Sequence, residues 1–471
     1  MSPPAPARPE RGRRELAFGV ALFALALAPR LYVALAWGGE PVWDGHYYDF
    51  GARRIAAGFG YSDDLMLGGQ SVWHPWCHYP VGYSAFLAFF YRFVAASTKI
   101  AAVVNALTGA ALAMVTWQLA RHAMGPLRAR LAGLLVALHP GLVLYAALVM
   151  TEPLAALLTL VAFWVAVAVP RPALGAALGA LVLGLAALVR PQALLCAPFL
   201  GLMAVHRGPG ASTASTVARG LAAAVVVSAI ALLPVLPWTA RNCRVMDGCA
   251  LVSTNAGWNL AIGAFPRATG RFETLRASDG CREVTGQVQQ DRCWLHYGAA
   301  EIAAHPIHWL SLVPAKLGYT FDHESFAVEY LREARPDAWP EERRVRFRAI
   351  TSAAHRALVC AAALGCVGLA LRGAGMAVQA SLLLLLGLLA YIGYAADSPT
   401  FWPLVVATAI VPWLPLPGAP PWPWGLRLGV ALLGTTVLTH GVFFGEDRYH
   451  LVVTPVLCLM AAAAFRRSSD A

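Results

Sequence analysis

Charged residues are scarce in this chain of 471 residues: Asp, Glu, Lys and Arg make up 13%, while apolar residues make up 58%. A soluble domain has roughly 25% charged and 45–50% apolar residues, so a soluble globular protein is excluded. The apolar residues come in long blocks, and an α-helix needs about 20 of them to cross a bilayer. The alternating strands typical of a membrane β-barrel are absent. The composition therefore predicts an all-α polytopic membrane protein.

Lysine is almost absent: of 36 basic residues only Lys99 and Lys316 are lysines. The net charge of +11 indicates no nucleic-acid partner, because in a polytopic protein the position of the charge matters more than its sum. Arginines precede the first apolar block and follow the last: Arg11, Arg13, Arg14, Arg466 and Arg467. The positive-inside rule then places both termini in the cytoplasm. The first block is too long for a signal peptide and lacks its cleavage pattern.

Twelve apolar segments are expected to cross the membrane within a single domain, 1–471. They lie at about 16–37, 98–119, 129–148, 153–169, 173–190, 191–206, 218–238, 350–371, 376–396, 401–416, 424–444 and 450–465. An even number of spans returns the C-terminus to the side of the N-terminus. Basic connections at 121–130, 206–219 and 371–373 then fall inside. Two long polar segments, 38–97 and 239–349, fall outside. We expect a bacterial inner membrane, with these segments and the active site facing the periplasm.

Parts of the outside segments have a helical period of apolar and charged residues. GHYYDFGARRIAAGF (45–59) and GYSAFLAFFYRFVAA (82–96) predict amphipathic helices lying in the membrane interface. HPIHWLSLVPAKLGYTF (305–321) is interpreted in the same way, with the alternative that it crosses and inverts everything after it. The basic cluster EERRVRFR (341–348) favours that inversion, whereas the two C-terminal arginines oppose it.

Of nine cysteines, five lie in the outside segments. The spacing of Cys243 with Cys249, and of Cys281 with Cys293, suits two disulfides in an oxidising compartment. Unlinked thiols are an equal alternative, and Cys77 is left over. No CxxC or His-rich spacing indicates a zinc site.

Ionisable residues at membrane depth are costly and mark candidate functional sites. The outside-facing ones are Arg30, Asp44, Glu152, Arg190, Arg241, Lys316, Glu446, Asp447 and Arg448. Asp44 suits a general base at the headgroup level, although by spacing alone a helix N-cap is the better interpretation. Glu152, between Thr151 and Pro153, is also typical of a helix start.

Further polar segments lie on the same predicted face. Arg190 in LVRPQALL suits phosphate binding through its planar guanidinium, or simple snorkelling to lipid headgroups. The segment 234–265 is rich in Asn, Gly and Ser after its prolines, as expected for a loop that presents amides to a polar ligand. GEDRYHLVVTPVL places a charged cluster directly before the last span, where pairing within the cluster is the structural alternative.

Taken in order, these segments resemble the membrane-embedded GT-C glycosyltransferases. The resemblance rests on Asp44 with Tyr47 and on ARRIAAGFGY, HYPVGYSAFLAFFYRF, TEPL, LVRPQ, PWTARN, NAGWNLAIGAF and EDRYHLVVTPVL. The nearest group is glycosyltransferase family 39 with its bacterial relatives, which include protein O-mannosyltransferases and the lipid A aminoarabinose transferase. Each motif is short, but the set covers nearly the whole chain.

The resemblance implies an inverting transfer of a sugar from a polyprenyl-phosphate donor to a protein, lipid or glycan acceptor on the non-cytoplasmic side. The donor, the acceptor and membrane lipids would be the partners. A carboxylate in the first outside loop is essential in that family, and here it is Asp44. Many members carry Asp-Glu at this point, whereas this chain has Gly45, so Asp49 or Glu152 becomes the supporting acid.

The expected catalytic residues are thus Asp44 and Glu152. The expected substrate-binding residues are Tyr47, Asp49, Arg53, His78, Arg190, Arg241, Asn242, Lys316, Arg448 and Tyr449. No cofactor is assigned. A divalent cation shared by Asp44 and Glu152 stays open, without a ligand spacing that argues for it.

Two other functions have a similar composition. A transporter or lipid-linked-sugar flippase would place charged or Gly/Pro-broken segments near the centre of its spans, and these spans are mostly Ala, Leu and Val. An O-antigen polymerase or ligase also uses polyprenyl-linked sugars, but does not predict the Asp44 loop so near the N-terminus.

Overall fold

The structure is a computed structural model that describes residues 8–205, 213–274, 276, 278–371, 375–395, 398–414, 416 and 421–464. Arg466 and Arg467, which support the predicted cytoplasmic C-terminus, lie outside the described residues. Parts of the basic connections 206–219 and 371–373 also lie outside them.

The long helices of the described part cross the molecule as predicted for a multi-pass membrane protein. Seven are long and apolar enough to span a membrane: α1 (Arg8–Trp37), α4 (Thr98–Arg121), α8 (Pro172–Val189), α10 (Thr213–Leu232), α17 (Glu341–Ala370), α18 (Met376–Ala395) and α20 (Trp424–Val442). An eighth is obtained if α5 (Pro126–Leu138) and the helical stretch after it, α6 (Pro140–Leu144) with η1 (Tyr145–Ala147), form one span bent by 53°.

Four shorter apolar stretches complete the set: α7 (Glu152–Ala168), η2 with α9 (Pro191–Cys196 and Ala197–Ala204), α19 with η5 (Trp402–Ile410 and Val411–Trp413), and α21 (Thr454–Ala463). Each of the twelve predicted segments therefore contains a helix. The number of segments that cross the bilayer stays a prediction.

Proline sets the bend between α5 and α6. Pro140 has no backbone N–H and its ring clashes with the preceding turn, so α5 ends at Leu138. The same residue begins α6, where a missing N–H costs nothing. His139 occupies the corner, buried, and its Nδ1 accepts a hydrogen bond from the backbone N–H of Leu142 at 3.4 Å. The bend thus directs an imidazole into the helix bundle.

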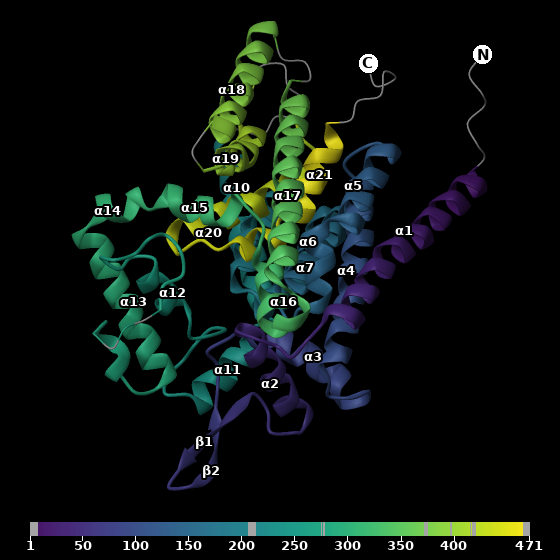
Figure 1. The fold of residues 1–471 in the computed structure, drawn as a ribbon. Helices are drawn as coiled ribbons and strands as arrows, with labels where there is room; N and C mark the ends of the chain where they lie inside the picture. The colour runs from purple at the N-terminus through teal and green to yellow at the C-terminus, as the bar shows by residue number, and fades with distance from the viewer. Residues whose placement is uncertain are drawn as a thin grey trace.

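The first outside segment folds as α2 (Asp44–Ala56), a hairpin of β1 (Ser62–Leu67) and β2 (Gln70–Pro75), and α3 (Val81–Phe93). The two helices match the predicted amphipathic stretches. The antiparallel hairpin corrects the all-α prediction. It turns at Gly68 and Gly69, which both have positive φ, as a tight two-residue hairpin turn requires. Figure 1 shows α2, the hairpin and α11 (Leu236–Val245) at the end opposite to the start of α1 and the end of α21.

The second outside segment contains mostly short helices: α11, α12 (Ala256–Ile262), η3 (Cys281–Glu283), α13 (Gln287–Ala304), α14 (Pro306–Ser311), α15 (Val313–Phe321), α16 (Phe326–Ala334) and η4 (Pro336–Ala338). The stretch 305–321 forms α14 and α15, which lie across the direction of α17 in Figure 1. Neither is among the helices long and apolar enough to span. This arrangement agrees with the in-plane interpretation.

The basic cluster 341–348 forms the first turns of α17, and acidic neighbours balance much of its charge. Arg344 contacts Glu329 at 2.8 Å and Glu341 at 2.7 Å, and Arg348 contacts Glu329 at 3.0 Å. These ion pairs tie the start of α17 to α16, and the orientation of the cluster relative to the membrane stays a prediction.

Candidate active site

Asp44 is the first residue of α2, and its carboxylate faces away from the helix start. Trp43 occupies the N-cap position with φ 51°, an unusual value for a non-glycine residue, and makes no capping hydrogen bond through its side chain. The Oδ1 atom of Asp44 instead accepts a hydrogen bond from the hydroxyl of Tyr79 at 2.7 Å. The N-cap interpretation of Asp44 is therefore wrong.

Arg448 meets Asp44 from a position 404 residues later in the chain. It lies on η6 (Asp447–Val452), the 3₁₀ turn between α20 and α21, and its Nη1 donates to Asp44 Oδ2 at 2.5 Å. Its Nε lies 2.6 Å from Glu446 Oε2, and its Nη2 donates to the Tyr449 hydroxyl at 3.2 Å. One guanidinium thus holds two carboxylates and fixes the orientation of Asp44.

Burial and charge set the protonation of these groups. Burial disfavours the charged form of Asp44, but Arg448 and the hydrogen bond from Tyr79 outweigh it and lower the pKa of this carboxyl. For Glu446 burial prevails over Arg448 and raises the pKa to about 7. Asp44 is therefore anionic at neutral pH, while Glu446 titrates near neutrality.

The α7–α8 helical hairpin brings Arg190 beside Glu152. Glu152 begins α7 and Arg190 follows the last residue of α8, so an antiparallel pair places both at one end. Arg190 Nη2 donates to Glu152 Oε1 at 2.6 Å and its Nε donates to Thr151 Oγ1 at 3.0 Å. Within the described part of the chain, Nη1 of Arg190 has no hydrogen-bond partner. Arg190 therefore keeps one donor group for an anionic ligand.

A cavity of about 450 Å³ connects these groups. Its wall includes five of the predicted site residues, Asp44, His78, Arg190, Arg448 and Tyr449. A much smaller pocket of about 30 Å³ shares Arg190 and Tyr449 with the cavity and lies between α7 and α20. The cavity thus adjoins the helix bundle at α7 and α20.

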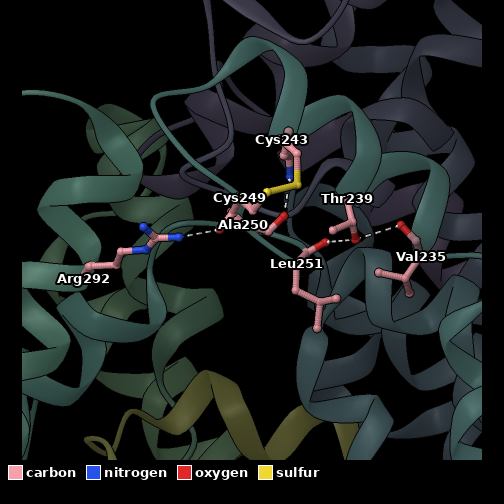
Figure 2. The surroundings of a disulfide bond; sticks show 8 residues. Val235, Thr239, Cys243, Cys249, Ala250, Leu251 and Arg292 are labelled. Atoms are coloured by element: carbon pink, nitrogen blue, oxygen red, sulfur yellow. Dashed lines mark hydrogen bonds between the residues drawn. A yellow bond between two sulfur atoms is a disulfide. The ribbon is translucent and has the colours of Figure 1, made fainter.

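A disulfide-bridged loop forms another wall of the cavity. Cys243 is bonded to Cys249, and Thr239 donates to the carbonyl of Leu251 at 2.8 Å, as Figure 2 shows. Arg292 reaches the carbonyl of Cys249 from the other side at 3.4 Å. These contacts hold residues 251–255, which supply Leu251, Val252, Ser253 and Asn255 to the cavity. The second predicted pair, Cys281 and Cys293, is also bonded, while Cys77 is free and buried.

Other predicted site residues have structural partners and do not line the cavity. Asp49 is bound by Arg53 at 2.6 Å and by the Tyr91 hydroxyl. Tyr47 packs against the rings of Trp76 and Tyr79 behind the wall.

Arg241, Asn242 and Lys316 also bind the backbone. Arg241 donates to the Tyr61 carbonyl at 2.6 Å, Asn242 to the Ala250 carbonyl at 3.1 Å, and Lys316 to the Val442 carbonyl at 3.1 Å. Burial lowers the pKa of Lys316 to about 8. Among the predicted cations, only Arg190 and Arg448 thus reach the cavity.

Sequence reasoning missed several lining residues. Tyr79, which donates to Asp44, lies between His78 and Pro80 in the stretch HYPVGYSAFLAFFYRF, quoted above for the resemblance. His440 stacks on Tyr449 with ring centroids 4.1 Å apart, and Trp258 stands edge-on to His78 at 5.4 Å. An ionisable residue near the end of the predicted span 424–444 was the available signal for His440. Tyr79 lies within the outside segment 38–97 among many other aromatic residues, and no signal singled it out.

A divalent ion shared by Asp44 and Glu152 is not what these contacts favour. Arg448 neutralises Asp44, and Arg190 neutralises Glu152 at 2.6 Å. Glu152 is fully buried and does not line the cavity. Asp44 and Glu152 thus each contact a different guanidinium, and no atom of Glu152 faces the cavity to share an ion with Asp44.

Fold and site define a multi-pass helical membrane protein with an ion-paired cavity near one end of its bundle. No family model matches the chain, and no curated protein is similar to it in sequence. Solved structures of the oligosaccharyltransferase AglB from Archaeoglobus fulgidus are distantly similar. The complex with an inhibitory peptide and a dolichol-phosphate has 12% identity and a TM-score of 0.42, over 96% of this chain and 50% of that one.

The complex of the Archaeoglobus fulgidus oligosaccharyltransferase with Zn and sulfate has 12% identity and a TM-score of 0.44, over 94% of this chain and 48% of that one. This chain therefore spans about half the length of the chains it matches. At TM-scores below 0.5 the likeness assigns no role to any residue.

Proposed function

We propose that the protein transfers a sugar from a polyprenyl-phosphate donor to an acceptor at this cavity, on the periplasmic side, with inversion. The observation that carries the proposal is the contact of Asp44 with Arg448 at 2.5 Å on the wall of a 450 Å³ cavity that Arg190 also lines. The motif resemblance to GT-C glycosyltransferases supports the same reaction.

Asp44 acts as the general base. The acceptor oxygen or nitrogen attacks the anomeric carbon, its proton passes to Asp44, and the bond from that carbon to the phosphate oxygen breaks. The pKa of Asp44 is lowered, so it is a weak base. A weak base suffices where the sugar carbon develops oxocarbenium character, because the acceptor then loses its proton late in the reaction. Tyr79 and Arg448 hold the carboxylate in place.

Arg190 receives the phosphate of the donor. Its Nη1 group has no partner within the described part of the chain, and the guanidinium is held in place by Glu152 and Thr151. The leaving polyprenyl phosphate gains negative charge, which a fixed cation stabilises. Arg448 donates to Asp44 through Nη1 and to Tyr449 through Nη2, and it acts mainly as the positioning residue for Asp44.

The test is Asp44→Asn in full-length protein, assayed for transfer of radiolabelled sugar from native lipid-linked donors in membranes. Loss of a general base lowers a rate by about 10²–10⁴-fold, and we expect a decrease of this size. Asp64→Asn is the matched control, because Asp64 is an ion-paired carboxylate in the same outside segment that does not line the cavity. Equal activity in Asp44→Asn and wild type would refute the proposed base.

No observation favours transport. The buried arginine within α1, Arg30, donates to the carbonyls of Val136 and Ala137 at the end of α5, at 2.8 Å and 2.6 Å. The Arg30 guanidinium thus caps the free carbonyl groups at the end of α5, and it lines none of the cavities described above.

A further inference from the structure

A second cluster of ionisable residues lies inside the bundle, apart from the cavity. Glu324, in the link between α15 and α16, faces His355 on α17 and His450 on η6, and all three side chains are buried. Glu324 Oε2 lies 3.1 Å from His450 Nε2 and 3.8 Å from His355 Nδ1. A fourth residue, His139 at the α5–α6 corner, places its Nε2 3.9 Å from the same oxygen.

We propose that Glu324, His355 and His450 bind a first-row divalent metal ion, with Zn²⁺ as the preferred one, and that this ion holds α17, η6 and the link before α16 together. The inference does not depend on the proposed transferase activity. Two imidazoles and one carboxylate form a ligand set that zinc uses in proteins, with water available for a fourth position.

The hydrogen bonds of His355 and His450 leave one unprotonated nitrogen on each ring available to bind a metal. His450 Nδ1 lies 2.7 Å from the carbonyl of Thr320, and His355 Nε2 lies 2.9 Å from the carbonyl of Phe321. A carbonyl only accepts, so each of these nitrogens carries the proton. The lone pairs of the other two nitrogens then face Glu324. A carbonyl that fixes the imidazole in this way is the usual outer contact of a metal-bound histidine.

The distances suit a single small ion. Tetrahedral zinc with bonds of about 2.0–2.1 Å separates its ligand atoms by roughly 3.3–3.4 Å. The two distances from Glu324 Oε2, 3.1 Å and 3.8 Å, bracket this value, and the three ligand atoms lie within 4.8 Å of one another. The rings of His355 and His450 are stacked with centroids 3.9 Å apart, so binding requires them to tilt apart.

An ion satisfies more of the cluster than a shared proton does. A proton between His450 and Glu324 completes one hydrogen bond. Within the described part of the chain, His355 Nδ1, Glu324 Oε1 and His139 Nε2 have no hydrogen-bond partner although all are buried. A divalent ion engages His355, His450 and Glu324 together and balances the buried carboxylate charge.

The site also bears on the cavity, because η6 carries both His450 and Arg448. A metal that fixes His450 fixes the turn from which Arg448 reaches Asp44. The ion would thus stabilise the orientation of the candidate base without contacting any substrate.

The experiment is elemental analysis of the full-length, tag-free protein purified in detergent without added metal or chelator. We expect about one first-row metal ion per chain in wild type and less than about a tenth of that in Glu324→Gln and in His355→Gln. His440→Gln is the matched control: His440 is equally buried, lies 3.0 Å from a backbone carbonyl and stacks on an aromatic ring, but lies outside the cluster. It should keep the metal.

A second measurement removes the dependence on variants that fold poorly. Wild-type protein stripped with a chelator is titrated with Zn²⁺, and its unfolding temperature is followed. We expect a rise with Zn²⁺ and none with Mg²⁺, because the ligand set favours zinc. Wild-type protein that carries no metal and shows no rise with Zn²⁺ overturns the proposal. Unchanged metal content in Glu324→Gln and His355→Gln also overturns it.

Discussion

Replacing Arg448 by Gln removes the cation that joins two carboxylates. In wild type Arg448 contacts Asp44 at 2.5 Å and Glu446 at 2.6 Å. Without the guanidinium, Asp44 keeps the cost of burial without its cation, and the pKa of Glu446 rises further, so that Glu446 is neutral at pH 7. The variant should unfold more easily, and the pKa of Asp44 should rise because its main stabilising charge is gone.

The size of the effect follows from the exposure of the three side chains. Breaking a fully buried ion pair costs about 3–5 kcal/mol. Here the side chains of Arg448, Asp44 and Glu446 are 13%, 23% and 30% exposed, so solvent screens part of the interaction. We therefore expect Arg448→Gln to lower the free energy of unfolding by about 2–3 kcal/mol. In Asp44→Asn/Arg448→Gln the loss should be smaller than the sum of the single losses, by about 1–3 kcal/mol.

The assay uses the five free cysteines, four of which are buried: Cys77, Cys196, Cys366 and Cys458. A thiol-reactive dye labels them as the protein unfolds, which reports stability in detergent. If the single losses of Arg448→Gln and Asp44→Asn add without coupling, the ion pair contributes nothing and the account of the site is refuted. The pH profile of transfer provides a second readout, since its acidic limb should move to higher pH in Arg448→Gln.

Two further predictions concern neighbours of Asp44. The pKa of Glu446 is raised to about 7, so the folded state binds the proton more tightly than the unfolded state. The free energy of unfolding should therefore fall as the pH rises from about 4.5 to 7. Glu446→Gln should remove this pH dependence, which unfolding measurements at a series of pH values would show. A Cβ at Gly45 would lie 2.2 Å from the Tyr330 hydroxyl and 2.9 Å from the Val149 carbonyl, so Gly45→Ala should cost about 1–3 kcal/mol. Gly387→Ala, at a helical position with no neighbouring atoms, should not lower the free energy of unfolding. Equal unfolding temperatures for the two glycine variants would contradict the close packing at Gly45.

The contact at Gly45 also explains a departure from the resembled family. Many members of the resembled family have an acid at this position. Here the Tyr330 hydroxyl and the Val149 carbonyl occupy the space that such a side chain would need. Glu446, from another part of the chain, contacts the same Arg448 as Asp44.

Much of the helical part of the fold was predictable from the sequence. Long apolar runs and flanking prolines are local signals, and each predicted span contains a helix. The amphipathic helices α2 and α3 follow from their period. The hairpin between them was missed although Gly68 and Gly69 signal a tight turn, because its strands are short and polar.

The site was predictable only as a set of candidates. Asp44 and Arg448 could each be named from charge near a span, but their contact joins residues 404 positions apart and depends on tertiary packing. Asp49 has the same local signals as Asp44, yet it pairs with Arg53 inside the outer segment. The Glu324–His450 contact spans 126 positions, so no local metal-binding spacing exists to be found.

The most direct test of the central claim is native mass spectrometry of the protein with the lipids that co-purify from native membranes. Wild type should carry a polyprenyl phosphate, the product of transfer. Asp44→Asn should instead carry a polyprenyl phosphate with its sugar still attached, since the base is missing but Arg190 is intact; the mass difference would identify the sugar. No polyprenyl lipid in wild type, or bare polyprenyl phosphate in Asp44→Asn at the wild-type proportion, would contradict the account.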